Sequence, residues 1–356
     1  MNLVTGRARL ATLAGALLIG CGNPSGPGTG GPCDALPIAT DNRTWTLTQL
    51  EYPGNLDDIE FNDIAGPWIV GSSAVDGFVS RRSGFRWNRA SPDHSPLNPA
   101  NPYLGSTGLA VNAAGAVLGL SIEPAVPLPD RATVWVDGFT PTPSGSLQMV
   151  GHAIGETNLV AGSTVFSSDT ARHAALWQPP NPFRDLGTLD GRHTEATAMS
   201  EGGLVTGYGV VGTAEEAFIW SDADSMRRIG RPAGATTVRP GAILDCGIIA
   251  GGALVSQMNR AWRWTERGGF TLLPLPAGAV QSHFRGMDSL GVVFGDVEFV
   301  AGDLRPYAWA GQQHYALPVN NRRPVLRAVD RCGSLLAVEH NPGQPDAVLV
   351  YEAVCD

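Results

Sequence analysis

The sequence predicts an all-β fold, a seven-bladed β-propeller with four-stranded blades, and three observations predict it. A glycine recurs at steps of 42 to 48 residues, and the last copy has alanine in its place: Gly71, Gly119, Gly162, Gly207, Gly251, Gly295 and Ala337. We call this position the ruler glycine. The aromatic that ends the next apolar run recurs with matching steps: Trp87, Trp135, Trp177, Trp220, Trp264, Trp309 and Tyr351. Each period also holds four short apolar runs, and four strands in about 40–45 residues are typical of a propeller blade.

The first predicted strand of each repeat leads into a tight turn. A short polar residue stands three positions before a glycine in five repeats, as in Asp63 with Gly66 and Ser200 with Gly203. Such a side chain can bond its own backbone two residues on, and glycine accepts a positive φ, so the pair favours a turn. Gly155 and Leu244 depart from this pattern in repeats three and five.

The remaining strands are apolar runs bounded by glycine. The second is a Val/Ile run such as 248–249, the third ends at the recurring aromatic, and the fourth resembles residues 185–189. Such runs fit strands that are buried on both faces. The strict spacing of the aromatics favours packing between blades, whereas Trp68 and Trp262 lie off this spacing and are better candidates for exposed rings.

The two ends of the repeat region complement each other. Residues 45–50 match a fourth strand, yet no first three strands precede them, and the seventh repeat stops at Tyr351 without a fourth strand. We therefore predict that the N-terminal strand is the outer strand of blade seven and closes the ring. The propeller domain is predicted to span residues 45–356.

The N-terminal 44 residues carry export signals. Residues 1–20 combine Arg7 and Arg9 with an apolar run, which is typical of a signal peptide and too short to span a membrane. Leu18-Ile-Gly-Cys21 resembles the bacterial lipobox, which implies a lipid anchor on Cys21; an ordinary signal peptide with a stray cysteine is the alternative. Residues 21–44 are predicted to be a flexible, lipidated tether. Position 22 is not Asp, and by its resemblance to Gram-negative lipoproteins the chain is expected at the outer membrane or cell surface.

Four further cysteines suggest disulfides in an exported chain: Cys33, Cys246, Cys332 and Cys355. A Cys33–Cys355 bridge would lock the predicted ring, because both residues flank the strands that close it. Cys246 and Cys332 occupy equivalent turns two blades apart, which is too far for a bridge. The rival connectivity joins Cys332 to Cys355 and Cys33 to Cys246.

Composition excludes several functions. The net charge of −9 opposes nucleic acid as a partner. All 24 basic residues are arginine, so no lysine can serve a phosphate loop or a Schiff base. Neither a catalytic motif nor a metal-ligand spacing occurs. We expect a non-enzymatic monomer without a cofactor or a metal.

One recurrent feature suggests a ligand site. A polar or charged residue precedes the third strand in several repeats: Arg131, His173, Glu216, Arg260 and Arg305. Strand alternation places them on the face that carries the second-to-third and fourth-to-first loops. Arginine presents a planar fork suited to carboxylate or phosphate, so Arg131, Arg260, Arg305 and His173 are candidates for binding an anionic glycan. The alternative is that each residue pairs locally with an acidic loop residue.

Repeat three resembles a known bacterial family. His173-Ala-Ala-Leu-Trp177 and Asp185-Leu-Gly-Thr-Leu-Asp-Gly191 are similar to the extracellular HAF repeat, with Ala175 where that family has phenylalanine. Repeat four has Glu216 in place of the family's histidine. The resemblance implies a propeller-type fold and export, and it implies no activity.

These observations together favour a membrane-anchored lipoprotein propeller that binds a glycan or another surface protein, or that acts as a scaffold. The alternative is a polysaccharide lyase or hydrolase, since propellers host such activities. Acidic or histidine side chains that converge on the mouth of the ring would favour the enzyme. A featureless mouth with long, varied loops would favour binding.

Overall fold

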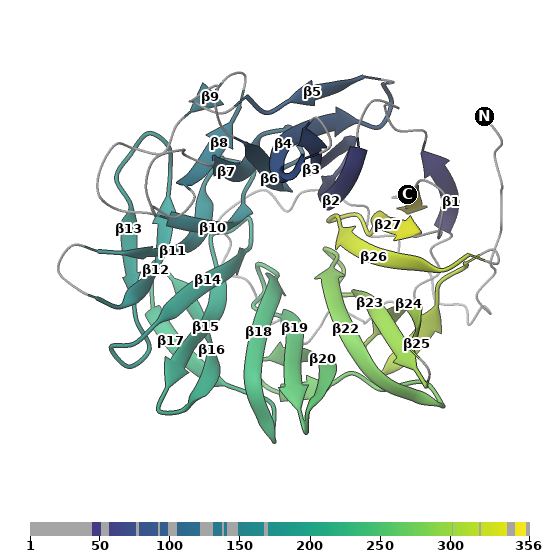
Figure 1. Cartoon of the computed structure of the whole chain (residues 1–356). Helices are drawn as coiled ribbons and strands as arrows, with labels where there is room; N and C mark the ends of the chain where they lie inside the picture. Colours follow the sequence, from purple (N-terminus) through teal and green to yellow (C-terminus); the bar gives the residue numbers. More distant parts are fainter. Residues whose placement is uncertain are drawn as a thin grey trace.

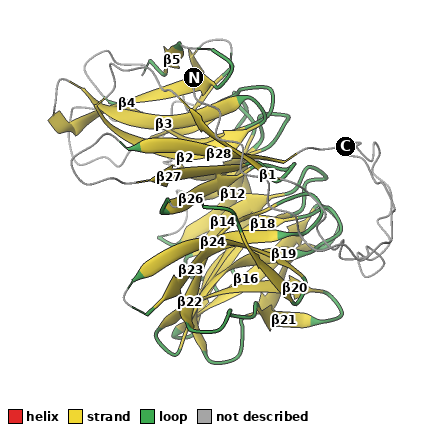
Figure 2. Cartoon of the chain, turned by 90° about the vertical axis from the view of Figure 1, so that its right-hand side faces the viewer, coloured by secondary structure: helices red, strands yellow, loops and turns green. Residues whose placement is uncertain are grey.

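Seven four-stranded antiparallel sheets surround one axis in the computed structural model (Figure 1). Figure 2 shows strands and loops in the described part of the chain, and no helix there is long and apolar enough to cross a membrane. The predicted seven-bladed, all-β propeller is therefore confirmed. The structure describes residues 45–50, 57–75, 78–91, 93–98, 105–121, 131–136, 139–140, 149–166, 170–300, 302–319, 322–339 and 346–353.

Blades one to six each use four consecutive strands, numbered from the axis outward. They are β2 (Asp57–Ala65), β3 (Trp68–Val75), β4 (Phe78–Asn88) and β5 (His94–Pro96); β6 (Ser106–Val111), β7 (Val117–Ser121), β8 (Arg131–Trp135) and β9 (Phe139–Thr140); β10 (Met149–Ile154), β11 (Val160–Val165), β12 (Arg172–Trp177) and β13 (Arg184–Gly187); β14 (Thr194–Met199), β15 (Val205–Val211), β16 (Ala214–Ser221) and β17 (Ser225–Gly230); β18 (Ala235–Ile243), β19 (Ile249–Val255), β20 (Met258–Thr265) and β21 (Gly269–Leu272); β22 (Ala279–Met287), β23 (Val293–Phe299), β24 (Asp303–Ala310) and β25 (Gln313–Ala316).

Blade seven joins the two ends of the described chain. It contains β26 (Pro324–Val329), β27 (Leu335–Glu339), β28 (Ala347–Ala353) and, as its outer strand, β1 (Trp45–Leu50). β1 pairs antiparallel with β28, from Trp45 opposite Ala353 to Leu50 opposite Val348. The side chains of Trp45 and Leu47 are buried in an apolar cluster with Phe294 of blade six. Ring closure by the N-terminal strand is confirmed.

The first-to-second turns have the predicted conformation. Gly66, Gly203 and their counterparts all have positive φ, and the Ser200 hydroxyl accepts the Leu204 N–H at 3.1 Å. The two departing repeats make the same turn by other means. In repeat three Asn158 takes the positive-φ place, with φ 63°, and in repeat five Gly247 takes it, with φ 83°. Asparagine tolerates this conformation better than most residues, so the turn survives without the expected pair.

The recurring aromatics hold neighbouring blades together. Their rings are buried, and the ring N–H groups of Trp135 and Trp309 donate to Asn98 O and Pro274 O, which follow the outer strands of the preceding blades, both at 2.9 Å. Tyr351 donates its hydroxyl to Pro318 O at 2.9 Å, which explains why tyrosine can replace tryptophan there. The expectation of an exposed Trp262 is wrong: its ring is 0% exposed, because it packs within the blade against Phe270.

Every innermost strand carries a bulge at the same place. The register shifts by one residue beside the ruler position in all seven strands, for example between Ala196 and Ala198 opposite Gly207. The bulge brings a carbonyl over the ruler glycine, so that a Cβ at Gly207 would lie 1.8 Å from Glu195 O. In blades one to six the ruler glycine is therefore needed for space, whereas blade seven accommodates Ala337. Bulges also redirect side chains, and the extra residue Thr197 donates to Pro240 O of the next blade at 2.7 Å.

Candidate functional site

The structure does not bring the predicted ligand residues together. His173, Arg260 and Arg305 lie on the third strands of different blades, and Arg131 begins β8 with a side chain outside the described residues. His173 Nδ1 lies 2.9 Å from the Asp185 carboxylate. Arg305 Nη2 lies 2.7 Å from the Asp303 carboxylate. Both residues therefore make the local acidic pairing that was the alternative.

Arg260 is held differently. Its Nη2 donates to Leu273 O at 3.0 Å, and partial burial lowers the pKa of Arg260. Among the described residues, Arg260 is therefore held by the backbone of its own blade and not by an acidic side chain.

Cys21, Cys33 and Cys355 lie outside the described residues. Cys246 is part of a disulfide. Both connectivities considered above, Cys33–Cys355 and the rival that joins Cys332 to Cys355 and Cys33 to Cys246, stay predictions.

A different set of polar side chains converges where the innermost strands begin. Three consecutive blades contribute to this set, which we call the axial cluster: His152, His193, Glu195, Tyr208, Glu215 and Arg239. In blade four the antiparallel register places the start of β14 beside the end of β15 and the start of β16. The cluster therefore lies on the face that carries the second-to-third and fourth-to-first connections, on the innermost strands and their neighbours.

Glu195 is the centre of the axial cluster. The Tyr208 hydroxyl donates to Glu195 Oε2 at 2.7 Å, and His193 Nε2 lies 2.8 Å from Oε1. From the neighbouring blade, His152 Nε2 lies 3.4 Å from Oε2. Burial alone would raise the pKa of Glu195, but hydrogen bonds from His152 and Tyr208 and the nearby charge of both histidines lower it to about 2. The carboxylate is therefore ionised and already engaged.

Tyr208 connects Glu195 to blade five. The Arg239 guanidinium lies 3.7 Å from the centre of the Tyr208 ring and also pairs with the Glu215 carboxylate. Burial and the hydrogen bond to Glu195 raise the pKa of Tyr208, so its hydroxyl remains a donor. The stacked guanidinium is fixed against a rigid ring.

The outer groups of the cluster are accessible. The side chains of His152, His193 and Arg239 are 32%, 39% and 48% exposed, against 16% for Glu195. Because an ionised carboxylate only accepts hydrogen bonds, each imidazole donates to Glu195 through Nε2. Within the described residues neither Nδ1 makes a hydrogen bond. The cluster thus presents two oriented imidazoles and one fixed guanidinium.

Sequence reasoning missed this site, although a signal for it exists. Glu195, Arg239 and His283 each precede the ruler glycine of their repeat by twelve residues. This position comes directly before the bulge on the innermost strand, so the three residues occupy equivalent places in blades four, five and six. His283 Nε2 lies 3.4 Å from the Glu298 carboxylate, which repeats the His–Glu pairing two blades further on, in blade six.

Among the described residues, no group of three or more His, Cys, Asp or Glu side chains is arranged to hold a metal ion.

No known family model matches the chain, and no curated protein sequence matches it. Solved propellers do. A puromycin-hydrolyzing peptidase from Mycobacterium tuberculosis is 12% identical with a TM-score of 0.58, covering 85% of this chain and 53% of the peptidase. The β-propeller domain of the Trilobed protease from Pyrococcus furiosus is 9% identical with a TM-score of 0.57, covering 84% of this chain and 97% of the domain.

Virginiamycin B lyase from Staphylococcus aureus is 9% identical with a TM-score of 0.52, covering 87% of this chain and 100% of the lyase. The fold is shared. At this identity the likeness shows the propeller alone, and this chain spans about half the length of the peptidase.

Proposed function

We propose that this protein is an exported binding module whose ligand contacts the axial cluster. The observation that carries the proposal is the convergence of polar side chains from three blades on an ionised, partly buried carboxylate, with two imidazoles and one guanidinium left accessible. Rigid strands hold these groups, and loops of different length surround them. A constant scaffold with a varied rim is how propellers and similar folds usually build a binding site.

The chemistry of the cluster suits a hydroxyl-rich ligand such as a glycan. Sugar hydroxyls both donate and accept hydrogen bonds, so the Nδ1 atoms of His152 and His193 can form hydrogen bonds with them while Arg239 donates. Glu195 does not need to contact the ligand, because its role is to hold both rings in place. The ligand is therefore expected to depend on the histidines and on Arg239.

A glycan array tests the proposal. The double variant His193→Ala with Arg239→Gln should lose at least about 90% of the wild-type signal, which corresponds to about 1.4 kcal/mol. His94→Ala with Arg227→Gln is the matched control, since it removes the same residue types from the outer strands β5 and β17. Equal binding by both double variants would contradict a site at the axial cluster.

The alternative is an enzyme, and by the criterion set from the sequence the convergence of histidine and acidic side chains favours it. We propose binding first because the Glu195 carboxylate is already engaged by Tyr208, His193 and His152. An imidazole fixed by a carboxylate through Nε2 is an oriented general base at Nδ1, which suits proton abstraction by a lyase or activation of water by a hydrolase. Mass spectrometry of acidic polysaccharides incubated with the protein separates the two functions. Shortened products that disappear in His193→Ala establish the enzyme, whereas unchanged polysaccharides recovered from a stable complex support the binding module.

The membrane anchor belongs to the same proposal. It is supported by the lipobox-like Leu18 to Cys21 and by the resemblance to exported HAF repeats, which we extend to residues 45–351; the signal and anchor lie outside the described residues. A lipid chain buries many methylene groups and so retains a protein on a bilayer. Cys21→Ser should therefore release the protein into the soluble fraction of a detergent-free lysate, and continued membrane fractionation would show another anchor.

A further inference from the structure

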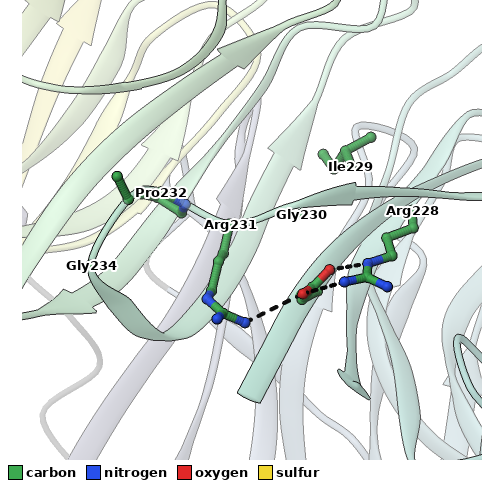
Figure 3. A pocket seen from close by; sticks show the side chains of 8 residues that line it. Arg228, Ile229, Gly230, Arg231, Pro232 and Gly234 are labelled. Carbon is green, nitrogen blue, oxygen red and sulfur yellow. Dashed lines mark hydrogen bonds and ion pairs between the residues drawn. The ribbon is translucent and has the colours of Figure 1, made fainter. Parts of the chain in front are cut away.

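A shallow groove lies beside the outer strand of blade four, and its lining residues do not belong to the axial cluster (Figure 3). Residues 228–234, at the end of β17 and in the connection to β18, form its wall together with Glu216 of β16. Its volume is about 600 Å³, which is within the range of small-molecule sites. The positive φ values of Gly230 and Gly234 and the buried Pro232 give the wall a fixed course.

The groove wall carries two cations around one buried anion. Arg228 Nη2 donates to Glu216 Oε1 at 2.6 Å and its Nε to Oε2, while Arg231 Nη1 donates to Oε1 at 3.3 Å. The Glu216 side chain is only 9% exposed. The three groups have a net charge of +1, and Asp190 is the other acidic residue near Arg228.

Both guanidinium groups keep donors for a ligand. The side chains of Arg228 and Arg231 are 53% and 35% exposed. Within the described residues neither makes another hydrogen bond, so Arg228 retains Nη1, and Arg231 retains Nε and Nη2. Glu216 fixes both groups before any ligand arrives, which reduces the ordering cost of binding.

We propose that this groove binds a carboxylate of an acidic ligand, such as a uronic-acid oligosaccharide, between Arg228 and Arg231. Glu216 already shows that a planar carboxylate suits both forks, and guanidinium–carboxylate pairs are the strong, geometrically specific kind. The net charge of −9 opposes an anion at long range, but near 0.15 M ionic strength this repulsion is screened beyond about 8 Å. The site is distinct from the axial cluster and does not depend on its function.

Calorimetric titration with trigalacturonic acid and with its uncharged methyl ester tests the groove. Arg231 is the residue to change, because Arg228 would still neutralise the buried Glu216. Arg231→Gln should weaken binding of the acid about tenfold or more, and Arg231→Lys should weaken it less, since a charge-assisted hydrogen bond contributes about 1.5–3 kcal/mol. Arg227→Gln is the matched control. Arg227 lies directly before Arg228 on β17 but pairs with Glu266, so its loss should leave the affinity for the acid within about twofold of wild type.

Any of three results would overturn the proposal. The protein could bind acid and ester with equal affinity, it could show no measurable binding of the acid at millimolar concentration, or the Arg231→Gln and Arg227→Gln variants could lose the same affinity for the acid. Inorganic phosphate that binds more tightly than the acid would assign the groove to a phosphate ligand instead. Loss of acid binding in His193→Ala with Arg239→Gln but not in Arg231→Gln would move this ligand to the axial cluster, leaving the proposed function intact and the groove refuted.

Discussion

Glu195 shows how one residue can organise a surface without being its most exposed part. Its two oxygens accept hydrogen bonds from Tyr208 and from histidines of two blades. A buried carboxylate is costly unless it is bonded, and here the bonds outweigh burial, so the pKa falls to about 2. The chemistry available to a ligand is thus determined by a side chain that faces mostly inward.

This arrangement predicts a pH-dependent contribution to stability. Because the folded-state pKa of Glu195 is about 2 and its ordinary value is 4.5, the contribution is present above pH 4.5 and is lost as pH falls through 2. Glu195→Gln should therefore unfold more easily than wild type at pH 7, by about 1–3 kcal/mol. Urea denaturation of both proteins from pH 7 to pH 2 should show this difference shrinking below pH 4.5. A difference that is constant with pH would mean that Glu195 is not held as an ionised centre.

At the scale of single residues, the sequence predicted the first-to-second turns but not the axial cluster. Polar–glycine pairs such as Ser200 with Gly203 are local, and their geometry follows from residue type alone. Glu195 and Tyr208, by contrast, meet only because their strands pair in one register, and His152 reaches them only from the next blade. Nothing in the spacing of the third-strand arginines indicates that Arg305 already pairs with Asp303.

At the scale of the element, the bulge links the repeat pattern to the site. The ruler glycine was visible as a period in the sequence, but its cause is a carbonyl of the bulged innermost strand. At Gly162 a Cβ would lie 2.0 Å from Val150 O and 2.9 Å from the Gly151 Cα. Glu195 and its equivalents Arg239 and His283 lie two residues before the extra residue of the bulge, so the repeated backbone geometry and the variable side chains are neighbours.

Gly162→Ala should therefore strain blade three. The added methyl group must displace backbone, and such overpacking costs about 1–3 kcal/mol. Differential scanning calorimetry should show a lower melting temperature than wild type. Ala337→Gly is the control, because blade seven accommodates alanine at the equivalent register position, opposite Leu326. A Gly162→Ala protein that melts at the wild-type temperature would show that the carbonyl can move at no cost.

At the scale of the whole molecule, the N-terminal strand β1 closes the ring by pairing with β28, the third strand of blade seven. The sequence contained this result, because an orphan fourth strand at one end and a missing one at the other can be matched from residue patterns. β1 pairs with β28 over its full length and buries Trp45 and Leu47. Without β1, β28 would present an unpaired edge, which is a liability for a soluble sheet.

Removal of residues 22–56 should therefore destabilise the ring. Burial of two large apolar side chains contributes about 3–6 kcal/mol, so the melting temperature should fall clearly. Removal of residues 22–44 alone is the control, since it also deletes Cys33 but keeps β1. Identical melting of the two truncated proteins would show that the strand contributes nothing beyond the cysteine.

The most direct test of the central claim, that ligands bind at the axial cluster, is hydrogen–deuterium exchange with a glycan selected on the array. We predict that the glycan slows exchange in β10, at the start of β14, in residues 188–193 that precede β14, and around Arg239 in β18. Exchange in the first-to-second turns, such as 200–204, should be unchanged. Protection confined to those turns or to the outer strands would contradict the account.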